Sequence, residues 1–278
     1  MIKMRILQIQ AHVYKEKEKN LDALEAKINE YKDQKIDLVT IGEMFDCPYQ
    51  TDCFPKYAEK EKEATWARLS SIAAKFGVYL SAGSVPEKDD KGHIYNTAYV
   101  FDRQGRQIAK HRKVHFFDVD IDGGQHFHES DTLTAGNECT TFDTEFGKMG
   151  LCICFDCRFP EFVRLMALEG AKVILVPASF NMTTGPAHWE LMLRSRGMDN
   201  QCFVVATSDA RDEKASYVSW GHSMVVSPWG SIVSEMDEKG CAKVIDIDLR
   251  EVENIRRQLP LMTARREDVY ELKKWVKQ

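Results

Sequence analysis

The chain of 278 residues lacks the features that would place it in a membrane or on a nucleic acid. No apolar run approaches the roughly 20 residues that a membrane-spanning helix requires. Acidic residues outnumber basic ones by 43 to 38, and the two signs are mixed along the chain. Phosphate-binding surfaces instead show clustered lysine and arginine. We therefore expect neither a membrane nor a nucleic acid among the partners.

The sequence also has no Pro- or Ser-rich linker, no fixed-period repeat and no low-complexity tract. At roughly 100–200 residues per domain, the length allows one large domain or two small ones. Strand and helix patterns alternate in both halves, which favours a single α/β domain over residues 1–278 with a large two-layer sheet core. Within it, residues 261–278 are a charged tail that carries aromatic side chains.

Eight cysteines are the one unusual count. A chain of this length does not need a disulfide framework, and residues 1–20 are typical of a strand followed by a charged helix start, not of a signal peptide. We therefore expect a cytoplasmic protein, in which cysteines are free, metal-bound or catalytic.

Hydrophobic periodicity predicts the order of the elements. The predicted strands are 4–10, 36–41, 78–85, 94–102, one ending near 112, 140–143, 148–154, 172–176, 202–208, 219–226, 231–236 and 242–247. The predicted helices are 18–35, 61–76, 160–169, 188–200 and 249–257. Residues 47–57 and 116–135 are predicted loops, and a loop as long as the second is usually functional in a compact domain.

The sharpest local feature is the segment 150–161, which holds Cys152, Cys154 and Cys157 within six positions. Zinc knuckles normally use thiol pairs on turns together with a distant second pair, and no second CxxC is present. Cys152 and Cys157 are expected to be packing residues, since cysteine is commonly buried. A metal-binding or redox-sensing protein remains the alternative from a different class.

A nucleophile is the second interpretation of this segment. An apolar strand runs to Cys154, the pattern then breaks sharply, and a helix begins near residue 160, as in a nucleophile elbow. A thiol needs activation at neutral pH. Glu43 follows the strand 36–41 directly and Lys113 follows another strand, although a solvated surface charge is the alternative for each. The residues alone thus indicate a cysteine hydrolase or transferase.

Glu43, Lys113 and Cys154, in this chain order, resemble the nitrilase (carbon–nitrogen hydrolase) superfamily over essentially the whole chain, with the strongest likeness to its ω-amidase branch. The stretches that carry the resemblance are 43–49, 95–98, 112–118, 127–130, the Cys154 segment, 180–190, 209–212 and 220–223. The resemblance implies an α-β-β-α sandwich of the nitrilase type. It also implies a homodimer that extends the sandwich to α-β-β-α-α-β-β-α, with residues 261–278 packing at the dimer interface.

The resemblance also implies catalytic roles. Cys154 would attack the amide carbon and carry a thioester, while Glu43 would take the thiol proton and protonate the leaving ammonia. Lys113 and the backbone N–H of Phe155 would stabilise the oxyanion. Glu129 would position the lysine and the substrate amide. No metal or organic cofactor is implied.

The implied substrate is a small amide, the terminal amide of a dicarboxylic acid monoamide such as 2-oxoglutaramate, which is hydrolysed to 2-oxoglutarate and ammonia. Arg158 would pair with the distal carboxylate, and Tyr49 and Thr184 would lie at neighbouring pocket positions. A surface ion pair with Glu161 is the alternative for Arg158. Deaminated-glutathione amidase and N-carbamoyl amine amidohydrolase are alternative activities on the same scaffold.

Two positions depart from the family pattern. Gly42 stands where the family usually has proline, which we expect to loosen the turn that presents Glu43, because glycine has more backbone freedom. Cys152 replaces a usual glycine and adds side-chain volume two residues before Cys154. Both departures bear on substrate fit.

Overall fold

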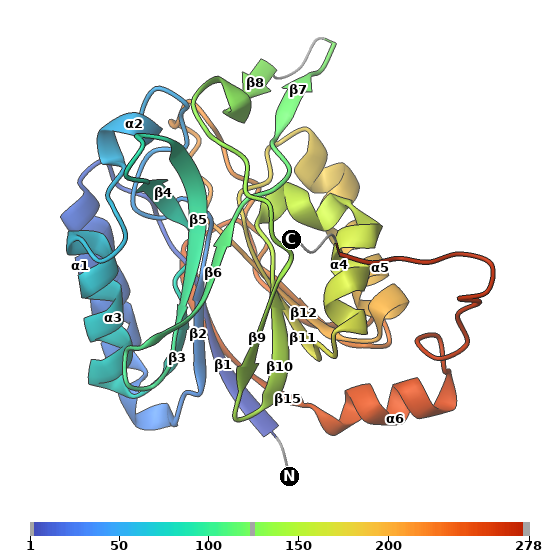
Figure 1. The fold of residues 1–278 in the computed structure, drawn as a ribbon. Coiled ribbons are helices and arrows are strands. Elements are labelled where there is room, and N and C mark those ends of the chain that lie inside the picture. Colours follow the sequence, from blue (N-terminus) through green and yellow to red (C-terminus); the bar gives the residue numbers. More distant parts are fainter. Residues whose placement is uncertain (1–2, 123–125, 275–278) are drawn as a thin grey trace.

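The computed structural model describes residues 3–122 and 126–274. Two β-sheets lie face to face in the centre of the molecule, and helices cover their outer faces (Figure 1). The helices are α1 (Lys17–Glu30) and α3 (Ala64–Phe76) on the first sheet, and α4 (Pro160–Leu168) and α5 (Thr184–Asn200) on the second. The predicted α-β-β-α sandwich is confirmed.

The first sheet joins the two ends of the chain. Its strands, in order, are β15 (Cys241–Asp248), β1 (Lys3–Gln10), β2 (Leu38–Ile41), β3 (Tyr79–Ser81), β5 (Ile94–Phe101) and β4 (Val85–Lys88), with β6 (Gln107–Arg112) also paired to β5. Strands β1, β2 and β3 are parallel, while β15 pairs antiparallel with β1 along its whole length. The last strand therefore closes the sheet against the first.

The second sheet contains six strands. In order they are β14 (Ile232–Glu235), β13 (Met224–Val226), β12 (Phe203–Ser208), β11 (Val173–Ala178), β10 (Gly147–Leu151) and β9 (Thr140–Thr144). Strands β10, β11 and β12 are parallel, so their carboxyl ends meet at one edge of the sheet. Ligand sites in α/β proteins commonly lie at such an edge.

Polar contacts between the sheets fix how the two edges align. The Thr40 and Thr207 hydroxyls are 2.8 Å apart, one residue before the ends of β2 and β12. Gln8 Nε2 donates to the Ala206 carbonyl at 2.8 Å in the same buried layer. Buried polar groups of this kind are costly unless paired, so they favour one alignment of the sheets. The carboxyl ends of β2 and β12 consequently lie at the same end of the sandwich.

Several predicted element boundaries were wrong. The predicted strand 78–85 is two strands, β3 and β4, because Gly83 has a positive φ of 58° and a Cβ there would lie 2.1 Å from the Gly42 carbonyl oxygen. The strand expected over 219–226 is only β13. Helix α5 begins at Thr184, four residues earlier than expected, where the Asn181 side chain accepts from the Thr184 N–H.

The two predicted loops also contain regular structure. The short helix α2 (Phe54–Tyr57) lies within residues 47–57. The hairpin of β7 (Asp118–Asp120) and β8 (His126–His128) lies within residues 116–135, although residues 123–125 lie outside the described part of the chain. These short elements carry little hydrophobic periodicity, which is why pattern analysis missed them.

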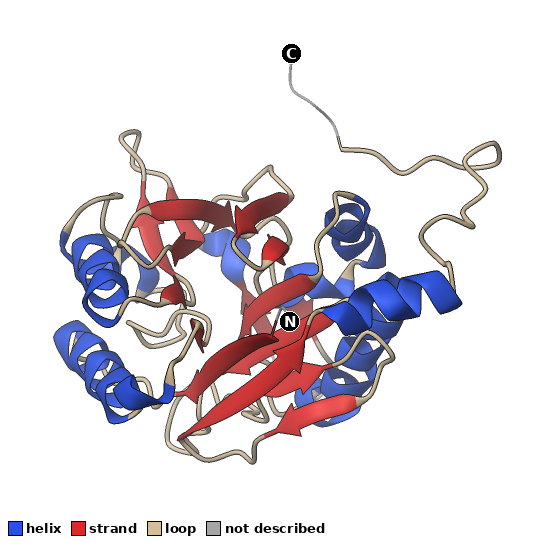
Figure 2. Cartoon of the chain, turned by 90° about the horizontal axis from the view of Figure 1, so that it is seen from below, coloured by secondary structure: helices blue, strands red, loops and turns tan. Residues whose placement is uncertain are grey.

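The chain after helix α6 (Arg250–Gln258) leaves the body of the molecule as an extended segment (Figure 2). It returns at Lys274, whose ammonium donates to the Cys139 carbonyl at 2.6 Å and pairs with Glu169. Residues 275–278 of the predicted tail 261–278 lie outside the described residues. Packing of the tail on a second subunit stays a prediction.

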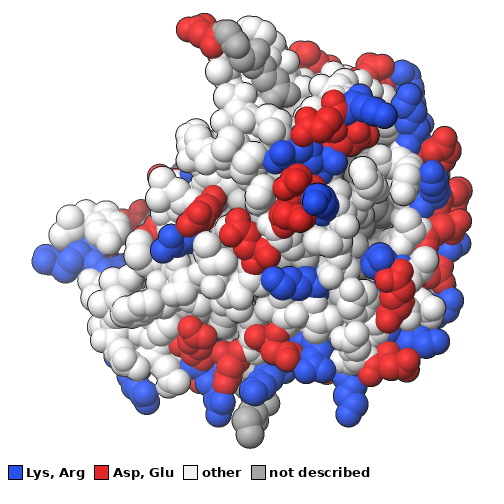
Figure 3. Space-filling view, turned by 180° about the vertical axis from the view of Figure 1, so that it is seen from behind, with Lys and Arg blue, Asp and Glu red and all other residues white. Residues whose placement is uncertain are grey.

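The described residues include no helix that is both long and apolar enough to cross a membrane. Lysines and arginines are interspersed with acidic residues over the face seen from behind (Figure 3). All eight cysteines fall in the described part of the chain and are free thiols. As expected, Cys152 and Cys157 are buried in the core.

Candidate active site

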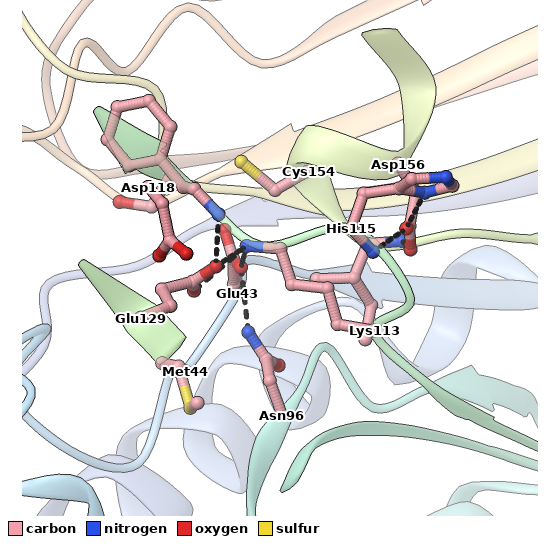
Figure 4. A network of polar contacts seen from close by, with 12 residues as sticks. Glu43, Met44, Asn96, Lys113, His115, Asp118, Glu129, Cys154 and Asp156 are labelled. Carbon is pink, nitrogen blue, oxygen red and sulfur yellow. Dashed lines mark hydrogen bonds and ion pairs between the residues drawn. The ribbon is translucent and has the colours of Figure 1, made fainter. Parts of the chain in front are cut away.

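Glu43, Lys113 and Cys154 come from three separate strand ends and lie together (Figure 4). Glu43 follows β2 by two residues, Lys113 follows β6 directly, and Cys154 opens the short 3₁₀ helix η3 (Cys154–Arg158) just beyond β10. All three side chains are buried. The structure therefore brings together the three residues that the sequence singled out.

The backbone at Cys154 is unusual, because its φ of 45° is left-handed. Non-glycine residues in this region are strained and occur preferentially at functional sites. The sharp break after the strand that the sequence predicted is present, and a 3₁₀ helix that was not predicted forms it. The next residue, Phe155, lies at the start of this helix, where backbone N–H groups have no partner within the helix. The backbone of Ser179, which follows β11 directly, acts on the Cys154 thiol and opposes the rise of its pKa.

The Lys113 ammonium lies between two carboxylates. Its Nζ is 2.8 Å from Glu43 Oε1 and 2.8 Å from Glu129 Oε2. Glu129 belongs to the 3₁₀ helix η2 (Glu129–Asp131) after β8, and its Oε2 also accepts from the Phe117 N–H at 2.7 Å. The long polar loop thus contributes a buried carboxylate to the cluster.

Two further side chains hold the carboxylates in place. The Tyr49 hydroxyl is 2.7 Å from Glu129 Oε1 and 3.1 Å from Glu43 Oε1, and it donates to one of them at a time. Asn96 Nδ2 on β5 donates to Glu43 Oε1 at 2.8 Å. Glu43 Oε2 remains buried without a hydrogen-bond partner among the described protein oxygens and nitrogens. The Cys154 thiol lies close enough to the Glu43 carboxyl to act on it, and this interaction opposes the rise of the Glu43 pKa.

Burial and charge set the protonation states of the cluster. Burial raises the pKa of Glu43, and the nearby Glu129 adds to this, while Lys113 opposes it. Burial alone would lower the pKa of Lys113, but Glu129 and Glu43 outweigh it and hold the pKa well above its usual value. Burial also raises the pKa of the Cys154 thiol. Lysine is therefore the fixed charge, and Glu43 is suited to accept and return a proton.

A second polar network joins the Lys113 segment to the Cys154 turn. One Asp156 oxygen accepts from His111 Nε2 at 2.9 Å and from the Ile153 N–H at 3.0 Å. The other accepts from His115 Nδ1 at 2.8 Å and from the His115 N–H at 2.9 Å. This fully buried carboxylate thus accepts hydrogen bonds from residues on both sides of Lys113 and from Ile153, which precedes Cys154. It therefore fixes the two segments relative to each other.

The predicted substrate residues have different surroundings. Tyr49 is part of the cluster itself. Arg158 stacks on Phe180, with its guanidinium 4.6 Å from the ring centre, and donates to His188 Nδ1 at 3.2 Å, not to Glu161. Its Nε is buried without a hydrogen-bond partner among the described residues.

Thr184 is the first residue of α5. Its hydroxyl donates to Asn181 Oδ1 at 2.9 Å. The same helix carries His188, the partner of Arg158. Thr184 therefore lies on the same helix as His188, and its own hydroxyl is already hydrogen-bonded to Asn181.

A cavity of about 510 Å³ lies next to the cluster. Its wall includes Tyr49, Ser179, Asp209, Tyr217 and Ser219. The Tyr217 hydroxyl donates to the Ser179 carbonyl at 2.5 Å, which ties this wall to the residue facing the Cys154 sulfur. A volume of this size accommodates a small organic acid with room for water.

The three neighbouring cysteines do not share one environment. Cys157 Sγ donates to the Cys154 carbonyl at 2.8 Å, and Cys152 is fully buried in the core. Across the described residues, no three His, Cys, Asp or Glu side chains are grouped as a metal ion would require. The geometry gives the cysteine-cluster metal hypothesis no ligand set.

Sequence reasoning missed Asn96, Asp156 and Ser179 as site residues. Asn96 had a signal, since it is a polar residue inside an otherwise apolar strand pattern and within a stretch of family resemblance. Asp156 also had one, because an acid two residues after the expected nucleophile is unlike a packing residue. Ser179 had none, since its contribution comes from the backbone, which every residue has.

Residues 3–257 match the sequence pattern of the carbon–nitrogen hydrolase family. The chain belongs to this family, and it is an enzyme of the amide-hydrolysing class. The match covers every strand of both sheets and stops within α6.

Relatives of known activity are similar over the full length. The ω-amidase NIT2 of Xenopus tropicalis is 44% identical over 270 residues, which are 97% of this chain and 98% of that protein. The ω-amidase NIT2 of Homo sapiens is 42% identical over 276 residues, covering 99% and 100%. The crystal structure of Saccharomyces cerevisiae Nit3, a member of branch 10 of the nitrilase superfamily, superposes with a TM-score of 0.87 at 39% identity and covers 95% and 97% of the two chains.

Replacing Asp156 tests the network that joins Lys113 and Cys154. Burial would raise the pKa of Asp156, but hydrogen bonds from His111, His115 and Ile153 hold it far below its usual value. We expect Asp156→Asn to lower the free energy of unfolding by about 3 kcal/mol, because it leaves buried donors without an acceptor. Urea denaturation at neutral pH measures this loss.

The stabilisation by a carboxylate with a lowered pKa is present above the unfolded pKa and is lost as pH falls through the folded pKa. The difference between wild type and Asp156→Asn should therefore shrink below about pH 4. Asp120 also bridges two histidines, His126 and His128, but it is exposed, so Asp120→Asn is the matched control and should leave stability nearly unchanged. Equal losses in the two variants would contradict the role given to Asp156.

Proposed function

We propose that this protein is an ω-amidase that hydrolyses the terminal amide of a small dicarboxylic acid monoamide such as 2-oxoglutaramate. The observation that carries the proposal is the buried cluster in which Glu43, Lys113 and Glu129 surround the Cys154 thiol. The ω-amidase relatives at 42–44% identity, which are covered over nearly their whole length, support the substrate class.

The first half-reaction forms a thioester. Glu43, whose carboxyl interacts with the thiol, accepts its proton as the sulfur attacks the amide carbon. The carbonyl π pair moves to oxygen, and the Lys113 ammonium together with the Phe155 N–H stabilises the oxyanion. When the carbonyl re-forms, the C–N bond breaks and Glu43 gives its proton to the departing nitrogen. Ammonia leaves, and the acyl group stays on Cys154.

The second half-reaction uses water. Glu43, again a carboxylate, takes a proton from the water as its oxygen attacks the thioester carbon. Collapse of the second tetrahedral intermediate expels the Cys154 thiolate, which recovers the proton from Glu43. Besides the chain and the amide substrate, only water takes part in this balance. Glu129 and Tyr49 keep Lys113 and Glu43 in position through both halves.

Arg158 provides the basis for preferring an acid as substrate. Its planar guanidinium forms bidentate pairs with carboxylates, and its buried Nε has no hydrogen-bond partner among the described residues. The Phe180 ring beneath it fixes its plane. We propose that the distal carboxylate of the substrate binds here while the amide reaches Cys154, with Thr184 on the neighbouring turn.

Removing the nucleophile tests the reaction. Cys154→Ala should release no ammonia from 2-oxoglutaramate, because no thioester can form. Cys152→Ala is the matched control, since it removes a buried thiol two residues away and should retain most of the turnover. Ammonia detection on purified protein measures both. Full turnover by Cys154→Ala would exclude the mechanism. If wild-type protein prefers deaminated glutathione or an N-carbamoyl amine in the same assay, the alternative activity on that substrate replaces the ω-amidase assignment.

Replacing the arginine tests the substrate class. Arg158→Gln should raise KM for 2-oxoglutaramate by about 10- to 100-fold, since a hydrogen bond to a charged group contributes about 1.5–3 kcal/mol. KM for a neutral amide such as butyramide should change little, and Arg158→Lys should be intermediate because it keeps the charge but loses the fork. An equal loss on both substrates would show that Arg158 supports the fold instead of recognising the carboxylate.

We also propose that the protein is a cytoplasmic homodimer. Eight free thiols suit a reducing compartment. Leu191 is 70% exposed, Trp229 60% and Met198 49%, and the three line one groove on the outer side of α5. Exposed apolar groups gathered in this way mark interaction sites. Pairing α5 with its copy would stack two sandwiches helix to helix and give the α-β-β-α-α-β-β-α arrangement, with the tail 261–278 beside the contact.

A charge in this groove tests the dimer. Wild-type protein should elute as a dimer at micromolar concentration in size-exclusion chromatography with light scattering. Leu191→Glu should shift it to a monomer, because a carboxylate would be desolvated at the contact. Glu190→Gln on the neighbouring exposed position is the control and should remain dimeric. A wild-type protein that is monomeric under these conditions would refute the proposal.

A further inference from the structure

A second acid lies against the backbone of the residue that precedes the catalytic base. Asp209 follows β12 directly and is only 5% exposed. A Cβ placed on Gly42 would lie 2.2 Å from Asp209 Oδ1 and 2.9 Å from its backbone nitrogen. Glycine at position 42 is therefore what allows the Asp209 carboxyl to reach the backbone beside Glu43. The sequence suggested that Gly42 would loosen the turn that presents Glu43; the structure shows that Gly42 lets Asp209 pack closely against this turn.

Asp209 has no compensating charge. Within the described part of the chain no lysine or arginine forms an ion pair with it, and its Oδ1 has no hydrogen-bond partner. The ionisable groups that interact with it are Glu43, the Cys47 thiol and the Tyr217 hydroxyl, none of which is a cation. Lys15, Asp212 and Lys214 line the same cavity nearer its opening. A buried carboxylate without a partner is strongly disfavoured.

Asp209 is also connected to the nucleophile. Ser179 interacts with both groups: its side chain acts on the Asp209 carboxyl and its backbone on the Cys154 thiol, and each interaction opposes the rise of the pKa concerned. Ser219 completes this small network, with its hydroxyl 3.2 Å from Ser179 Oγ and 3.3 Å from the Asp209 carbonyl oxygen. Asp209 thus interacts both with Glu43 and with Ser179, the residue whose backbone acts on the Cys154 thiol.

We propose that Asp209 is a positioning residue that works in its protonated form, and that its ionisation opposes proton transfer between Cys154 and Glu43. A neutral carboxyl fills the space beside Gly42 and interacts with Ser179 without adding charge. An ionised one places a second negative charge beside Glu43 and makes thiolate formation harder. The inference deepens the proposed function, because it rests on the thiol mechanism given above.

The direction of the pH effect follows from these contacts. Burial raises the pKa of Asp209 well above its usual value, and Glu43 adds to the rise. At low pH Asp209 is neutral, so it does not influence the ionisation of Glu43 there. As pH rises and Asp209 loses its proton, the added charge raises the pKa of the Cys154 thiol. Asp209 should therefore act on the alkaline side of the profile only.

Titration of the thiol tests this without any substrate. The rate of Cys154 alkylation by iodoacetamide is followed by mass spectrometry of its peptide, which separates it from the other cysteines. Asp209→Asn mimics the neutral acid in shape, and its alkylation midpoint should move to lower pH by about one unit relative to wild type. Glu213→Gln removes an exposed charge from the same loop and should leave the midpoint unchanged.

The pH profile of kcat/KM for 2-oxoglutaramate is the second readout. Asp209→Asn should move the alkaline limb to higher pH and leave the acid limb in place. Superposable titrations of wild type and Asp209→Asn would overturn the proposal, as would a loss of rate that is equal at every pH. If Asp209→Asn does not fold, Asp209→Ser should show the same shifts. If wild type hydrolyses no amide, the proposed function fails while the thiol titration still tests Asp209.

Discussion

The burial of one lysine between two glutamates is the constraint on which the site depends. An ammonium removed from water costs several kcal/mol unless opposite charges compensate it. Lys113 has Glu43 and Glu129 at 2.8 Å, and these carboxylates are themselves held by Tyr49 and Asn96. The cluster is stable only as a set, since removal of one member would leave a buried charge unpaired. The same arrangement keeps a positive charge fixed where an oxyanion would form beside Cys154.

The two sheets make this arrangement possible. Parallel strands bring their carboxyl ends to one edge, and the contact of Thr40 with Thr207 aligns the edges of both sheets. Glu43, Cys154 and Asp209 are each within three residues of a strand end at this edge. Asp156 then locks the turn of Cys154 to the segment of Lys113. The scaffold therefore fixes the distances between the reacting groups, and the short turns determine which atoms face the cavity.

Much of the fold could be predicted from the sequence because buried strands and amphipathic helices have clear periodicity. The two-layer sheet core, most strands of the second sheet and helices α1, α3, α4 and α6 follow from that pattern, whereas the α-β-β-α sandwich was implied by the family resemblance. The prediction failed where local pattern does not decide the outcome. The break at Gly83 results from the approach of the Gly42 carbonyl, and the β7–β8 hairpin forms by backbone pairing of Asp118–Asp120 with His126–His128. Both depend on residues that pattern analysis does not bring together.

The sequence by itself determined the chemical types at the site and their order along the chain, because a thiol, a carboxyl and an ammonium at strand ends carry both a chemical signal and a family resemblance. Only the tertiary structure decided their protonation and their partners. Burial and neighbouring charge raise or lower a pKa through distances across the fold, and Glu43 is 70 positions from Lys113 in sequence. Gly42 shows the same limit, since its meaning comes from Asp209, a residue on the other sheet that no local pattern connects with it.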